Sequence, residues 1–158
     1  MEPRPETHDW LATVRAFLEV AMGEGGAVAE NERALALALD RLALATHAAK
    51  RGAPRTDTLA PRGDTSALRM RMAAHFPDLG LYRAGSLETG GAELVGDALD
   101  DLVDLVGDLS DALWLAEHVG EADARWQFHF ELRTHWGRHL RALQWYLHER
   151  REAQPLRR

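Results

Sequence analysis

The sequence contains no cysteine and, apart from Lys50, no lysine. Without cysteine there can be no disulfide, no thiol nucleophile, and no zinc or iron–sulfur cluster bound by thiolates. The 19 basic residues are outnumbered by 25 acidic ones, for a formal net charge of −6. Because nucleic acid is bound mainly through its phosphates, this balance opposes a nucleic-acid partner, and none is expected.

Long hydrophobic runs are also missing. The longest, "ALALALDRLALATHAA", is interrupted by Asp40 and Arg41 and is too short to span a bilayer, so no membrane association is expected. The N-terminal stretch "MEPRPETHDW" has no apolar core of the kind found in signal peptides. We therefore expect a cytoplasmic protein.

The apolar residues that are present recur mostly at helical spacing, and no pair of segments is typical of a β-hairpin. At 158 residues the chain is predicted to form a single all-α domain, a bundle of about five helices. Residues 6–150 are its expected ordered core and 151–158 a frayed tail. Thr7 is predicted to cap the first helix and Thr65 or Ser66 the third, and the other helices are predicted to begin at about Val28, Ala92 and Asp123. The five helices are predicted to end near Ala21, Lys50, Phe76, Val119 and Arg150. The last two are joined by so short a link that they should form a long antiparallel pair.

Five aspartates form a stripe along the helix predicted at 92–119. They lie almost opposite the apolar face and are Asp97, Asp101, Asp104, Asp108 and Asp111. Carboxylates repel one another at this spacing, so the stripe needs compensation. Three sources are open: solvent, the Arg- and His-rich helix that follows or a protein partner, and a divalent cation held through oxygen.

The next helix contains the stretch "FHFELRTHWGRHLRALQWYL", in which Glu131, His135 and His139 are spaced i, i+4, i+8. Two histidines at i, i+4 can bind one metal ion, with Glu131 as a third ligand or as a hydrogen-bond partner that orients an imidazole. The alternative is a network of ion pairs with Asp101, Asp104 or Asp108 of the preceding helix. Arg138 could hold an anionic group or pair with an aspartate.

Gly137 lies inside this predicted helix, where glycine costs about 1 kcal/mol relative to alanine. A helix usually accepts that cost where another backbone or a bulky ring approaches closely. Gly107 raises the same question one helix earlier.

The C-terminal third of the chain resembles a bacterial family known as domain of unknown function 5063. The resemblance is carried by an Asp-Asp-Leu-x-Asp helix and by a Trp-x-Phe-x-Phe-Glu-x-x-x-His-Trp-Gly-x-His helix, here Asp100, Asp101, Leu102, Asp104, Trp126, Phe128, Phe130, Glu131, His135, Trp136, Gly137 and His139. The first half of the chain departs from the pattern, with "LALATH" where the family has a Leu-Tyr pair. The resemblance implies an all-helical fold, no established activity, and Asp and His positions that form one polar cluster.

Two hypotheses of function follow. The first is a non-catalytic protein-interaction or structural module with a protein partner or a second copy of itself, since no nucleotide-binding loop or catalytic triad motif is present. The alternative is a metal-dependent hydrolase or transferase whose divalent metal is bound by Asp104, Asp108, Glu131, His135 and His139. In that case Asp101 and Arg138 complete the polar cluster.

Overall fold

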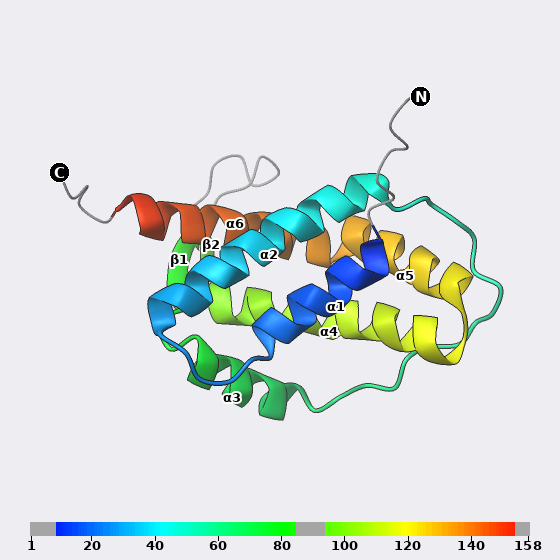
Figure 1. The fold of residues 1–158 in the computed structure, drawn as a ribbon, viewed down its shortest axis with the longest axis horizontal. Helices are drawn as coiled ribbons and strands as arrows, with labels where there is room; N and C mark the ends of the chain where they lie inside the picture. The colour runs from blue at the N-terminus through cyan, green and yellow to red at the C-terminus, as the bar shows by residue number, and fades with distance from the viewer. Residues whose placement is uncertain (1–8, 85–93, 154–158) are drawn as a thin grey trace, which may run out of the picture.

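The computed structural model of the chain describes residues 9–84 and 94–153, which form one all-α bundle with a small two-stranded sheet at one end (Figure 1). The described residues contain six helices, one more than predicted. None of these helices has the length and apolar content needed to cross a membrane.

Helices α1 (Trp10–Ala21) and α2 (Val28–Ala48) form an antiparallel pair (Figure 1). Asp9 caps α1, because its side chain accepts hydrogen bonds from the backbone N–H groups of Leu11 (3.1 Å) and Ala12 (3.2 Å). The predicted cap, Thr7, lies outside the described residues. The apolar face of α1 is buried and consists of Trp10, Val14, Phe17, Leu18 and Ala21.

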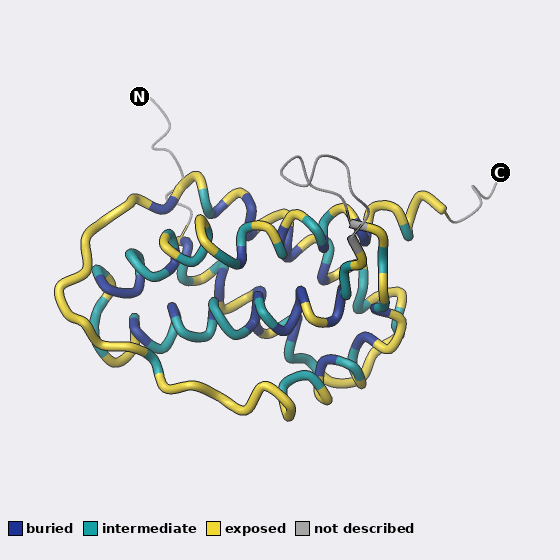
Figure 2. The backbone as a smooth tube through the Cα atoms, turned by 180° about the vertical axis from the view of Figure 1, so that it is seen from behind, coloured by how far each residue is buried: buried dark blue, intermediate teal, exposed yellow. Residues whose placement is uncertain are grey.

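A long segment without regular structure connects α2 to α3 (Thr65–His75). Every residue from Lys50 to Asp64 except Ala60 is exposed, and the segment runs around the far end of the bundle (Figures 1 and 2). It is anchored midway by the buried carboxylate of Asp123, whose Oδ1 accepts hydrogen bonds from Arg55 N (3.1 Å), Thr56 N (2.8 Å) and Thr56 Oγ1 (2.9 Å). The cap of α3 is Asp64, so the prediction of Thr65 or Ser66 was wrong by one or two residues.

Strands β1 (Leu81–Ala84) and β2 (Leu94–Asp97) form an antiparallel pair in which Tyr82 lies opposite Gly96. The expectation that the chain holds no hairpin was therefore wrong, as was the start of the next helix at Ala92. That helix, α4 (Ala98–His118), begins where the Asp97 side chain caps the N–H groups of Leu99 (2.9 Å) and Asp100 (3.4 Å).

Helix α4 is the centre of the bundle and contacts α1, α3, α5 and α6. Its core residues Leu102, Leu105, Val106 and Leu109 are fully buried. A short link at Val119–Gly120 turns the chain into α5 (Glu121–Thr134), which lies antiparallel to α4 as predicted (Figure 1).

The single helix predicted from Asp123 to Arg150 is in fact two, α5 and α6 (Trp136–Glu152), separated at His135. The backbone of His135 (φ −141°, ψ −81°) is not helical. Across this break, the indole N–H of Trp136 donates a hydrogen bond to the backbone carbonyl of Phe128 in α5 (3.2 Å). The side chains of Trp136 and Phe128 are both fully buried.

The break between α5 and α6 explains why residue 137 is a glycine. A Cβ atom at this position would lie 2.1 Å from the carbonyl oxygen of Leu132, closer than any side chain can approach. The sequence-based expectation of a close backbone approach at Gly137 is therefore confirmed. Gly107 has no such neighbour, since no atom of the described residues lies within 4 Å of the corresponding position.

Candidate metal centre

The polar cluster forms where α4 passes the junction between α5 and α6. Asp101, Asp104 and Asp108 follow one another along one side of α4, one helical turn apart. His135 is the junction residue itself, and His139 follows one turn into α6. The break at His135 does not separate the two imidazoles, whose ring centroids are 4.8 Å apart at an interplanar angle of 73°.

Each histidine is held through its Nδ1 atom by a different aspartate. Nδ1 of His135 lies 2.7 Å from Oδ2 of Asp108, and Nδ1 of His139 lies 2.6 Å from Oδ1 of Asp101. Because an ionised carboxylate can only accept a hydrogen bond, each Nδ1 carries the proton. In a neutral imidazole the lone pair is then on Nε2, the arrangement seen in histidines that bind metals.

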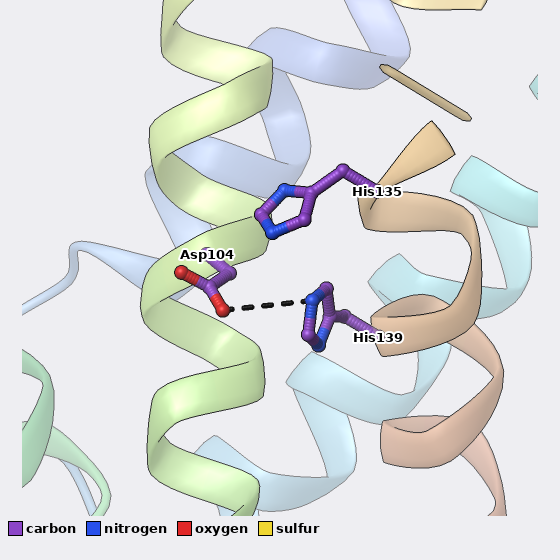
Figure 3. A group of neighbouring side chains, drawn as sticks. All are labelled: Asp104, His135 and His139. Carbon is purple, nitrogen blue, oxygen red and sulfur yellow. Dashed lines mark ion pairs between the residues drawn. The ribbon is translucent and has the colours of Figure 1, made fainter. Parts of the chain in front are cut away.

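Nε2 of His139 faces a third carboxylate, that of Asp104. Nε2 of His139 lies 3.5 Å from Oδ2 of Asp104, the contact drawn as a dashed line in Figure 3. The ring of His135 points toward the same side of α4 (Figure 3). One ligand atom from each of Asp104, His135 and His139 can be chosen so that all three lie within 4.8 Å of one another.

A second group shares His135. Ligand atoms of Asp108, Glu131 and His135 also lie within 4.8 Å of one another. Glu131 accepts hydrogen bonds from Gln127 Nε2 (3.1 Å) and, more weakly, from Thr134 Oγ1 (3.5 Å). All five residues predicted to bind a metal therefore lie in one region, in two overlapping groups.

Negative charge accumulates beside this second group. Burial, and then the nearby charge of Asp108, raises the pKa of Glu131, and burial likewise raises the pKa of Asp108 despite its bond to His135. Burial, Asp108 and Glu131 together raise the pKa of Asp111 to about 6. These acids are therefore harder to ionise than isolated carboxylates, mainly because they are buried.

Comparisons with known proteins show the fold. The crystal structure of protein BF1032 from Bacteroides fragilis is similar, with a TM-score of 0.71 and 19% sequence identity over 97% of this chain and 94% of that chain. No protein-family model matches the sequence, and no curated protein is significantly similar to it. The resemblance to the domain of unknown function 5063 stays a prediction made from the sequence.

Arg138 and Asp97 take no part in this cluster. Arg138 is exposed and pairs with no acid in the part of the chain that the structure describes. Asp97 is the cap of α4, and it is neutralised together with Asp100 by Arg69 of α3 rather than by the C-terminal arginines. Asp101, expected on the polar face, is buried at 8% exposure.

Tyr82 also belongs to the cluster but was not predicted from the sequence; its hydroxyl donates a hydrogen bond to Oδ2 of Asp101. Burial, and then the bond to Asp101, raises the pKa of Tyr82 above its ordinary value. The one signal in the sequence was an isolated Gly96 within "LVGD", since a glycine inside a strand often marks the close approach of another group.

Proposed function

We propose that this protein binds a divalent transition metal ion through Nε2 of His135, Nε2 of His139 and the carboxylate of Asp104. The observation that carries the proposal is the pair of Nδ1 contacts to Asp108 and Asp101, at 2.7 and 2.6 Å. Each contact occupies Nδ1, so Nε2 of the same ring is left to bind a metal ion. Nε2 of His139 already faces a further carboxylate, that of Asp104, at 3.5 Å.

Two imidazole nitrogens and one carboxylate oxygen are donors that suit zinc and neighbouring transition metals rather than magnesium or calcium. The side chains of Asp104 and His135 are 43% and 37% exposed, so solvent can reach the site. Three protein ligands leave a position for water, which a bound metal makes more acidic. Hydrolysis or group transfer is the chemistry that such a centre supports, and Glu131, with a carboxylate oxygen within 4.8 Å of a ring nitrogen of His135, is the candidate base for a proton of that water.

The non-catalytic interaction module is the second candidate. It is supported by the exposed aromatic side chains Trp145 (61%) and Phe130 (46%), the latter stacked on Trp126 at 4.9 Å. In this case the histidine–aspartate contacts are ion pairs that hold α4 against the junction. A bacterial origin and a cytoplasmic location stay predictions made from the sequence.

The test is titration of tag-free protein with zinc, and with cobalt as a spectroscopic probe, by calorimetry and absorbance. We expect one tightly bound equivalent, and a melting temperature that zinc raises. His135→Ala and His139→Ala should each weaken binding by more than about 100-fold, since direct ligands matter more than the residues that orient them.

His148→Ala is the matched control. His148 lies exposed on the same helix, its ring near that of Trp145, and no ion pair holds it among the described residues. Its loss should leave zinc binding unchanged. If wild-type protein binds no stoichiometric metal, the proposal fails and the ion-pair network of the interaction module is the better reading.

A further inference from the structure

The buried carboxylate of Asp101 is shared between two elements that are distant in the sequence. Its Oδ1 accepts from Nδ1 of His139 on α6, at 2.6 Å, and its Oδ2 accepts from the hydroxyl of Tyr82 on β1. At 8% exposure, Asp101 has little access to water for other hydrogen bonds. The direction in which its Oδ1 points therefore depends on what holds Oδ2.

The small sheet holds the Tyr82 ring in place. Tyr82 lies opposite Gly96, and a Cβ atom at Gly96 would lie 2.3 Å from Cζ of the ring. The ring thus lies across the backbone of β2, in space that any other residue would fill. On its other side it meets the ring of Tyr146 on α6, with centroids 5.5 Å apart.

Tyr146 fastens the same end of the sheet to α6. Its hydroxyl accepts from Gly80 N (3.0 Å) and donates to the carbonyl of Asp78 (3.2 Å). Gly80 in turn accepts a backbone hydrogen bond from Ala98, the first residue of α4. The base of the hairpin is therefore tied to both helices that carry the polar cluster.

The two histidines differ in this support. Asp101 is held by Tyr82, whereas the only hydrogen-bond partner that Asp108 has among the described residues is His135 itself. Losing the Tyr82 hydroxyl should therefore disturb His139 and leave His135 as it is.

We infer that Tyr82 is a positioning residue for the centre: its hydroxyl holds Asp101 so that the proton of neutral His139 stays on Nδ1 and Nε2 faces Asp104. Gly96 contributes to the same positioning, because the absence of a side chain at this position leaves room for the Tyr82 ring. The consequence for metal binding rests on the proposed function. The tautomer of His139 does not, since it is a property of the metal-free protein.

The decisive measurement is a long-range ¹H–¹⁵N correlation spectrum of histidine-labelled, metal-free protein, recorded at a pH where the imidazoles are neutral. It reports which nitrogen of each ring carries the proton. In wild type, His139 should be protonated on Nδ1. In Tyr82→Phe, which keeps the ring and removes only the hydroxyl, a large fraction of His139 should shift to the Nε2-protonated form while His135 does not change.

Gly96→Ala should cause the same tautomer shift of His139, because the added methyl group displaces the Tyr82 ring even though the Tyr82 hydroxyl is still present. Thr46→Ala is the control: it removes a partly buried hydroxyl from α2, away from the sheet, where that hydroxyl donates to the carbonyl of Ala43 (2.7 Å). The control should keep the wild-type tautomer of His139.

In zinc titrations Tyr82→Phe should lose about 10–100-fold in affinity, the usual effect of removing a group that orients a metal-binding histidine. If the tautomer of His139 is the same in wild type and Tyr82→Phe, or if wild-type His139 carries its proton on Nε2, the inference is overturned. If the tautomer shifts as expected but wild type binds no zinc, the positioning role stands and the proposed metal function fails.

Discussion

Alanine substitutions at Gly107 and Gly137 should have opposite effects on stability. Both glycines lie inside helices, α4 and α6. At Gly107 an added Cβ meets no atom within 4 Å in the part of the chain that the structure describes, whereas at Gly137 it would lie 2.1 Å from the carbonyl oxygen of Leu132. The added methyl group therefore has room at position 107, whereas at position 137 it would collide with the backbone.

The magnitudes follow from these surroundings. Gly107→Ala should raise the free energy of unfolding by about 0.5–1 kcal/mol, because alanine loses less conformational entropy in a helix. Gly137→Ala should lower it by about 1–3 kcal/mol, the usual cost of overpacking a site whose neighbour cannot move aside. The two variants should thus differ by about 1.5–4 kcal/mol, or about 3–16 °C in melting temperature for a domain of this size.

Urea denaturation, followed by circular dichroism and tryptophan fluorescence, measures this difference. The midpoints should move in opposite directions, with similar slopes if both variants unfold in one transition. If Gly137→Ala stabilises the protein as Gly107→Ala does, then α5 and α6 are one continuous helix in solution. The junction at His135, and with it the geometry of the candidate centre, would then be wrong.

Three further predictions concern other parts of the molecule. Trp136→Ala should lower the free energy of unfolding by about 3–5 kcal/mol because Trp136 is fully buried. Trp145→Ala, on the exposed side of the same helix, should change it by less than about 0.5 kcal/mol. A similar loss for both variants would contradict the structure's assignment of which side of α6 faces the core. Burial and neighbouring carboxylates raise the pKa of Asp111 to about 6, so its protonated form is favoured in the folded state, and the stability it confers below pH 4 is lost as the pH rises through 6. Denaturation of Asp111→Asn at pH 4 and pH 7 should therefore show a gain over wild type of about 1 kcal/mol at the higher pH only, after allowance for partial exposure. Asp123→Ala should free the anchored segment and speed its cleavage in limited proteolysis, while Asp57→Ala in the same segment should not.

The helices were predictable because their signals are local. Apolar residues at helical spacing placed α1, the helix-forming Ala and Leu residues placed α2, and a capping residue together with Pro77 placed α3, each within a few residues of its true bounds. The short link at Gly120 predicted the antiparallel packing of α5 on α4. Capping residues were misplaced where an aspartate precedes the predicted serine or threonine, as at Asp64.

The hairpin was not predictable by the same means. Its strands are four residues each, and residues 85–93 intervene between them. A strand of that length shows too little alternation to distinguish it from the start of a helix, and β2 is followed at once by α4. What stabilises the pair is tertiary: Tyr82 lies over Gly96 and against Tyr146.

The candidate centre was predicted in part. Opposite charge on neighbouring helices correctly indicated that the histidines meet the aspartates. Which aspartate contacts which histidine depends on the break between α5 and α6 at His135. The sequence has no proline or helix-ending glycine there from which the break could have been predicted. Tyr82 reaches the cluster from an element that the sequence did not predict.

The exposed segment from Lys50 to Asp64 has a consequence for how the chain can be divided. It separates α1 and α2 from the rest, yet the two parts share one core, in which the rings of Trp10 and Phe128 lie 4.8 Å apart. The parts are also joined across their surfaces by Arg150 and Glu32 and by Gln144 and Asp40. A protein cleaved in this segment would be held together as a heterodimer of its own fragments, and its stability would then depend on concentration, as that of any noncovalent assembly does.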